Sequence, residues 1–464
     1  MPIDDGGGAG GVSSDNHRRR DPQWVSRALR EFLAVPLIVV AAFLLLATLS
    51  IVLDQSHAAW LSAPRRVLGH VVGKGAASAA LSAIATGLVT VTSITFSVLL
   101  LALQQTAASL SPVVFDQFVR RRSNQVYLGF FIGLAVYSYV VLAAVQQSTP
   151  PVLGAALAVL LTAVALLILL TLVYSTLNQM RPVNVIFAIR TAALIARSHE
   201  LDILRHTRRT PLRTGAPAAT ALSRSTGYVT GIDVEAMQAA CAQAPEAEVE
   251  LVVTLGMYVV VGDPLALVRG TVEEAGCVTD AFRDDVIELN RQRDPDVDAT
   301  ASVEELANIA WTSGSTAKHS PEIAAEALNA LRDLLCRWSP AADEGVSGND
   351  VLPVVYRDDD CERVVDSMLG MVAVAHESQQ QQTMARVLAA FTLALPRLRE
   401  ADRWRVAAGL HEAAPMLAQG AWTPKLRGAG ARVSEVLAQV GCNDAADALA
   451  TAFQQEHDAR RLLR

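Results

Sequence analysis

The sequence predicts an α-helical integral membrane protein with four transmembrane helices, followed by a mainly α cytoplasmic region with a small α/β module of short strands. Three observations predict this class. Four long apolar runs near the N-terminus carry no charge, one later region is rich in β-branched residues, and most of the remainder has amphipathic helical spacing. Of the 464 residues, 52% are hydrophobic and 18% are charged. This composition excludes a disordered chain and is unusual for a soluble enzyme.

The apolar runs define the N-terminal part of the chain. Residues 1–22 are mostly glycine, serine and charged residues, so we expect a disordered N-terminal tail. A transmembrane helix needs about 20 apolar residues. Four runs reach that length within a transmembrane domain at 23–182, with spans at about 32–53, 76–105, 125–145 and 152–176. Because the first run is too long for a signal peptide, we expect it to be an uncleaved anchor.

The positive charges beside the spans predict the orientation, because basic residues near span ends are retained on the cytoplasmic side. Eleven arginines lie before the first span, between the second and third, and after the fourth. Only Arg65, Arg66 and Lys74 lie in the other loops. We therefore expect a multi-pass protein of the bacterial inner membrane with both termini in the cytoplasm. Within this set, Arg120, Arg121 and Arg122 fit two interpretations, the orientation signal itself and contact with anionic lipid headgroups.

The chain after the spans divides into three predicted parts: a connecting helix and linker at 183–226, a small α/β module at 227–275, and a helical cytoplasmic domain at 276–464. Two segments rich in β-branched residues, at 227–232 and from Glu248, predict strands. Asp233 is a predicted helix N-cap. Ser302 and Glu305 predict a capping box, and Pro321 is the expected first residue of a helix capped by Ser320. Amphipathic runs then continue almost to the C-terminus.

The second span carries a row of hydroxyl side chains. Because their spacing is three or four residues, they share one helix face, within a sector of about 120°. The row continues to a glutamine one turn beyond and consists of Ser78, Ser82, Thr86, Thr90, Ser93, Ser97 and Gln104. Two interpretations fit: the row lines a hydrated path in an oligomer, or it lets helices pack closely and bond to each other. The spans contain no Asp, Glu, Lys, Arg or His, which argues against proton relays and voltage sensors.

The sequence indicates no catalytic, cofactor-binding or metal-binding site. The acidic run at 358–360 lacks the glycine and the final glutamate of a calcium loop, so it is interpreted as carboxylates at a helix start. His319, His376 and His411 have no partner at metal-ligand spacing, and phosphate-loop and nucleophile motifs are absent from the sequence. We expect no enzyme activity and no cofactor. A binding, regulatory or scaffolding role is favoured, with an oligomeric channel or transport component as the alternative.

Charge and composition also limit the partners. The net charge is +6 for residues 1–200 and −13 for the remainder. The basic residues lie beside apolar runs, so no surface for nucleic acid is expected. The expected partners are the lipid bilayer and further copies of the same chain; the sequence names no other protein partner.

Residues 94–133 carry a pattern that extends from the second span into the third. The residues that form it are Phe96, Ser97, Leu103, Gln104, Ser111, Pro112, Phe118, Arg122, Asn124, Gln125, Leu128 and Gly129. This pattern resembles that of a bacterial family of predicted membrane proteins, domain of unknown function 2254. The resemblance implies a membrane protein and no particular reaction. Two departures stand out: Val113 replaces an arginine typical of the family, and the stretch Trp311–Glu322 differs from the family's Ala-Leu-Ser-Pro segment.

Overall fold

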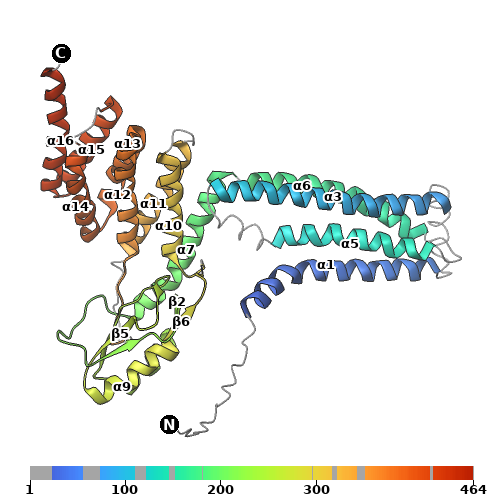
Figure 1. Ribbon diagram of the computed structural model, residues 1–464, viewed down its shortest axis with the longest axis horizontal. Coiled ribbons are helices and arrows are strands. Elements are labelled where there is room, and N and C mark those ends of the chain that lie inside the picture. The colour runs from blue at the N-terminus through green and yellow to red at the C-terminus, as the bar shows by residue number, and fades with distance from the viewer. Residues whose placement is uncertain are drawn as a thin grey trace, which may run out of the picture. The chain divides into compact units, whose positions relative to one another are not determined.

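The computed structural model describes residues 23–55, 74–109, 122–145, 152–179, 181–294, 296–315, 321–341, 351–417 and 422–462 (Figure 1). The predicted tail at 1–22 and the loops between the spans lie outside these residues. The chain forms two compact units. We call Met1–Asn178 the membrane unit and Gln179–Arg464 the C-terminal unit.

The membrane unit consists of long apolar helices. They are α1 (Gln23–Gln55), α3 (Lys74–Ser109), α5 (Arg122–Val145) and α6 (Val152–Gln179). Each contains a stretch that is long and apolar enough to cross a bilayer, and the four stretches are Leu33–Gln55, Ser78–Val98, Arg122–Ala144 and Val152–Asn178. The predicted fold class is thus confirmed for this part of the chain.

Two glycines on α5 allow close packing against α1. A Cβ atom added to Gly129 would lie 2.9 Å from the backbone Cα of Pro36, and one added to Gly133 would lie 2.5 Å from the ring of Phe43. The two glycines are one turn apart in a G-x-x-x-G pattern, which lets helix backbones approach in a membrane. The ring of Phe43 then packs edge-on against Phe130 of α5. This pattern is not among the features predicted from the sequence.

Polar contacts fix the start of α6. The Asp54 carboxylate, near the end of α1, accepts hydrogen bonds from the backbone N–H groups of Leu153 and Gly154 at 3.1 and 3.0 Å. These N–H groups belong to the first turn of α6 and have no partner within the helix, so a carboxylate there is stabilising. The hydroxyl of Tyr137 on α5 donates to the carbonyl of Gly154 at 3.1 Å. Helices α1, α5 and α6 are therefore tied together at this end.

The C-terminal unit begins with α7 (Pro182–His206), where Pro182 takes the favoured first position of a helix. Strands and short helices follow: β1 (Ala219–Leu222), β2 (Gly227–Ile232), α8 (Val234–Gln243), β3 (Glu248–Leu251), β4 (Tyr258–Val259), β5 (Pro264–Arg269), α9 (Val272–Ala281), the π-helix η2 (Phe282–Val286) and β6 (Ile287–Asn290). Asp233 caps α8, as predicted, by accepting bonds from Glu235 and Ala236.

The strands form two small sheets. One has the order β1-β5-β3-β7 and the other β4-β2-β6. Strand β7 (Val354–Val355) comes from much later in the chain and pairs in parallel with β3. The strands therefore extend on both sides of the 227–275 segment in which they were expected, with β1 in the predicted linker. Between two later helices the chain returns to this sheet and forms β7. The pairing of β7 positions the residues that follow it.

The remainder is helical: α10 (Ala299–Ser315), α11 (Pro321–Ala341), α12 (Asp360–Glu377), α13 (Gln381–Ala394), the 3-10 turn η3 (Leu395–Arg397), α14 (Glu400–Leu417), α15 (Pro424–Gln439) and α16 (Asn443–Leu462). The capping box predicted at Ser302 is wrong, because α10 begins three residues earlier and Asp298 accepts the bond from the N–H of Ala301. Pro321 does begin α11, and Ser320 lies outside the described residues. Figure 1 shows these helices stacked along one direction, from α10 and α11 at one end to α15 and α16 at the other, and alternate helices such as α11, α13 and α15 are in contact.

Candidate functional site

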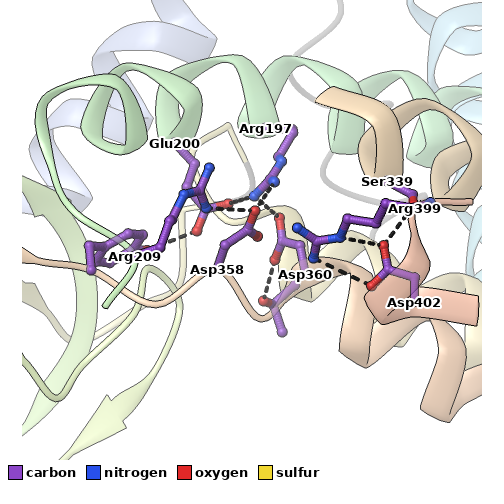
Figure 2. Close-up of polar contacts among 10 residues, drawn as sticks. Arg197, Glu200, Arg209, Ser339, Asp358, Asp360, Arg399 and Asp402 are labelled. Atoms are coloured by element: carbon purple, nitrogen blue, oxygen red, sulfur yellow. Dashed lines mark hydrogen bonds and ion pairs between the residues drawn. The ribbon is translucent and has the colours of Figure 1, made fainter. Parts of the chain in front are cut away.

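A buried group of charged side chains lies where α7, the end of β7 and the start of α12 meet (Figure 2). We call it the ionic cluster and define it as Arg197, Glu200, Arg209, Asp358 and Asp360. Arg197 and Glu200 are three residues apart on α7 and so point to the same side. Asp358 and Asp360 follow β7, whose pairing with β3 brings this segment beside α7. The Arg197 side chain is only 2% exposed.

Arg197 is the centre of the ionic cluster. Its Nη1 donates to Oε2 of Glu200 at 2.7 Å and to Oδ2 of Asp360 at 3.1 Å, and its Nη2 donates to Oδ2 of Asp358 at 2.6 Å. Arg209, just after α7, donates to the same Asp358 oxygen at 3.0 Å. One guanidinium thus holds three carboxyl groups from two chain segments.

Neutral side chains complete the enclosure. The hydroxyl of Tyr356, which is fully buried, donates to Oε1 of Glu200 at 2.8 Å and accepts from the backbone N–H of Leu255. Thr300, in the first turn of α10, contacts Oδ1 of Asp360 at 3.5 Å. The Arg197 guanidinium lies 5.7 Å from the ring centre of Trp338 on α11, a cation–π distance. The ionic cluster therefore joins α7, the sheet and the helical domain.

Burial and charge act in opposite directions on the acids of the ionic cluster. Burial and the nearby Glu200 charge raise the pKa of Asp360 well above its ordinary value, against the lowering effect of Arg197. Burial alone would also raise the pKa of Asp358, but its bonds to Arg197 and Arg209 lower that pKa below the ordinary value. Burial opposes the charged form of Arg197, yet the three carboxyls raise its pKa and keep it protonated.

A second buried polar contact lies beside the first. The Ser339 hydroxyl, at the end of α11, donates to Asp402 of α14 at 2.6 Å, and Arg399 donates to the same carboxylate at 2.7 Å. Figure 2 shows this group next to the ionic cluster. It fixes the start of α14 against the end of α11.

The ionic cluster is enclosed and already paired. Its central side chains are between 2% and 6% exposed, apart from the more accessible Arg209. Among the described residues, no group of three His, Cys, Asp or Glu side chains is arranged to hold a metal ion. The chemistry that this arrangement supports is proton binding and mechanical linkage of three chain segments.

The hydroxyl row on α3 faces away from the core of the membrane unit. Leu81, Ala85 and Leu88 are the α3 side chains buried against the other helices. In contrast, Ser78 is partly buried, and the remaining members of the row, from Ser82 to Gln104, are exposed. The Thr90 and Ser97 hydroxyls donate to carbonyls one turn back, at Thr86 and Ser93. The row therefore does not mediate packing among the described helices of one chain.

A groove between α3 and α5 borders the hydroxyl row. Its volume is about 330 Å³, and its lining includes Thr92, Ser93, Phe96, Phe131 and Tyr139. The Thr92 hydroxyl is buried and has no hydrogen-bond partner in the described part of the chain. A buried hydroxyl without a partner is costly in an apolar medium. This groove and the row form one continuous side of α3.

The structure brings together only part of the predicted sites. Arg122 is exposed at the start of α5, while Arg120 and Arg121 lie outside the described residues. The prediction that the acidic run at 358–360 lies at a helix start is confirmed, because α12 begins at Asp360, and the structure adds that Asp358 and Asp360 are buried against Arg197. The ionic cluster was not predicted from the sequence. One signal was present: Arg197 and Glu200 continue the apolar spacing of α7, on its buried face.

Comparison with known families gives one match. The family model described as "Predicted membrane protein (DUF2254)" matches residues 30–392, which are 363 of the 464 residues. The match includes the membrane helices and the ionic cluster, and it confirms the resemblance seen at residues 94–133. Neither curated proteins nor solved structures give a match.

Proposed function

This chain belongs to the DUF2254 family of predicted membrane proteins, and from that premise we propose a binding and regulatory role, without catalysis, at the bacterial inner membrane. In this proposal both termini are cytoplasmic, so the C-terminal unit is the cytoplasmic part. Its task is to bind a partner in response to the state of the membrane helices, or to pass its own state to them.

The observation that carries this proposal is the ionic cluster on α7. This helix follows the fourth apolar helix after a break of two residues, 180 and 181. Arg197 and Glu200 of α7 are bonded to residues beside both the sheet and α12. Arg190 of α7 also donates to Asp333 of α11 at 2.8 Å. A displacement of α7 would therefore move the sheet and the helical domain together.

The enclosure of the same residues favours binding over catalysis. The central side chains of the ionic cluster are shielded from solvent, so a substrate would not reach them. Active sites are usually open pockets with perturbed ionisable groups. Here the perturbed groups are in a closed joint between structural elements.

Hydrogen exchange in bilayers of different thickness tests the proposed transmission. Bilayer thickness changes the tilt of membrane helices. We expect wild-type protein in nanodiscs of short-chain and long-chain lipids to differ in amide exchange at the starts of α10 and α12. A flexible glycine-serine insertion between Arg181 and Pro182 should abolish that difference, because it uncouples α7 from α6. If amide exchange in the C-terminal unit of the wild type does not change with bilayer thickness, the proposal is refuted.

A second candidate function, an oligomeric channel or transport component, is supported by the exposed hydroxyl row. Side chains exposed on α1 and α6 are mainly large and apolar, among them Leu45, Leu49, Leu167 and Leu170. Of the four apolar stretches, Ser78–Val98 of α3 has the lowest mean hydropathy, and the serines and threonines of its row are mostly exposed. We propose that this face meets further copies of the chain, either around a hydrated path or in a close helix contact.

Ion flux in liposomes separates these two roles of α3. The triple variant Ser82→Leu, Thr86→Leu, Thr90→Leu should abolish flux if the row lines a path. A matched control carries Thr48→Leu and Thr171→Leu, two exposed threonines on α1 and α6 that bond to their own helix backbones. The control should keep the wild-type flux. Flux in the triple variant equal to that of the wild type would refute the channel proposal. If the wild type shows no flux and the triple variant no longer assembles, the row acts in helix packing.

A further inference from the structure

The formal charges of the ionic cluster do not balance. Two guanidinium groups, Arg197 and Arg209, face three carboxyl groups, Glu200, Asp358 and Asp360. A buried excess charge is expensive, and a carboxyl group in that position takes up a proton instead. Asp358 is bonded to both arginines, so it is the acid best compensated as a carboxylate. The excess therefore lies on the other two acids.

Glu200 and Asp360 share one partner. The same Arg197 nitrogen, Nη1, donates to Glu200 at 2.7 Å and to Asp360 at 3.1 Å, so the two carboxyl groups lie beside each other. An ionised carboxylate can only accept hydrogen bonds, so two carboxyl groups bond to each other only with a proton between them. We propose that Glu200 and Asp360 form a proton-binding site, in which Asp360 carries the proton and donates a hydrogen bond to Glu200.

The surroundings of the pair decide which group responds to pH. The other ionisable groups that face it are Arg197 on α7, Arg209 after α7, Tyr356 and Asp358 before α12, Cys361 on α12, and the pair Arg399 and Asp402 at α14. Burial raises the pKa of the Tyr356 hydroxyl and of the Cys361 thiol, so both stay neutral. Arg399 and Asp402 neutralise each other. Asp360 is therefore the group that gains or loses a proton.

Loss of this proton should weaken the joint that α7 makes. The pKa of Asp360 is raised in the folded chain, whereas an unfolded aspartate has a pKa of about 3.9. Between these two values the folded state binds one more proton than the unfolded state, so stability falls as pH rises. One proton corresponds to about a tenfold decrease in the folding equilibrium constant per pH unit. Acids whose pKa is ordinary or lowered are ionised above about pH 5, so a stability measurement that starts there does not include their titration.

Infrared spectroscopy of the full-length protein detects the proton directly, as the C=O stretching band of a protonated carboxylic acid. Wild-type protein at neutral pH should show this band, and Asp360→Asn should remove it. Glu200→Gln should also remove it, although Asp360 is still present, because the charges then balance without the proton. Glu248→Gln is the matched control: it alters a buried acid on β3 that bonds to the backbone N–H groups of Leu212 and Arg213, outside the ionic cluster, and it should keep the band.

The pH dependence of stability is the second readout. The folding equilibrium constant should be compared between about pH 5 and pH 9. In this range the constant of the wild type should fall by about tenfold more per pH unit than that of Asp360→Asn, until the pH passes the pKa of Asp360. The Glu248→Gln control should keep the wild-type slope even if its absolute stability is lower. A wild type without the band, or a band that persists in both Asp360→Asn and Glu200→Gln, would overturn the proposal.

The link from this proton to regulation rests on the proposed function, but the proton itself rests on the geometry alone. The experiments keep the two apart. Thickness-dependent exchange without an infrared band would overturn the proton-binding site and leave the proposed transmission intact. A band in a protein whose exchange ignores bilayer thickness would support the proton-binding site and refute the transmission.

Discussion

The variant Arg197→Met is expected to lower the free energy of unfolding of the C-terminal unit by about 3 to 5 kcal/mol, the usual cost of removing one partner from a buried ionic pair. Methionine has a similar length and fills much of the same space. It cannot donate hydrogen bonds, so Glu200 and Asp358 would stay buried with reduced compensation. Chemical denaturation of the full-length protein in mild detergent, followed by circular dichroism, measures the loss.

Arg190→Met is the matched control, because it removes an arginine from the same helix. Arg190 is paired with Asp333, and the two side chains are 19% and 36% exposed. Partly exposed pairs contribute about 0 to 1 kcal/mol, so this variant should have a small effect. Equal losses in Arg197→Met and Arg190→Met would contradict the central place given to the ionic cluster.

Gly129→Leu is expected to destabilise the membrane unit by about 1 to 3 kcal/mol or more, because it overpacks the contact between α1 and α5. The first added atom would already lie 2.9 Å from the Pro36 backbone, which has no side-chain freedom to move aside. Separation of the helices would also expose the contact between Phe43 and Phe130. Thermal unfolding in detergent and the recovery of monodisperse protein measure the effect.

Gly87→Leu provides the comparison within the same unit. Gly87 is on α3, and an added Cβ would have no neighbour within 4 Å. Leucine also favours a helix more than glycine does, by up to about 1 kcal/mol. The Gly87→Leu variant should therefore unfold at or above the wild-type temperature. A similar loss in both glycine variants would show that hydrophobic bulk in this unit, and not the α1–α5 contact, is responsible.

Several elements could be predicted because their signals are local. The apolar runs, the β-branched segments and the cap at Asp233 each need only neighbouring residues to be recognised, and all three are present in the structure. The failure at Ser302 has a local cause as well. Asp298 offers a competing cap four residues earlier, and the helix begins directly after it. The family resemblance at residues 94–133 was also a sequence signal, and the family match confirms it.

The ionic cluster could not be predicted, because its partners are far apart in the chain. Arg197 bonds to Asp358 and Asp360, which are 161 and 163 residues away. They meet only because β7, a strand of two residues, pairs with β3. Such a short strand has no recognisable pattern, and an acidic run looks the same whether it is solvated or buried.

For the hydroxyl row too, the sequence predicted one property and the packing decided another. The spacing of the serines and threonines was enough to place them on one face of α3. Only the packing of Leu81, Ala85 and Leu88 decided that this face points away from the other described helices of the chain.

The sequence by itself determined that four helices cross a membrane and that a mainly helical region with short strands follows, because hydropathy and periodicity act over short stretches of chain. The tertiary structure alone decided which charges are buried, which glycines bring helices together and which acid holds a proton. These properties depend on distances between remote segments and on the exclusion of water, and neither is written in the order of residues.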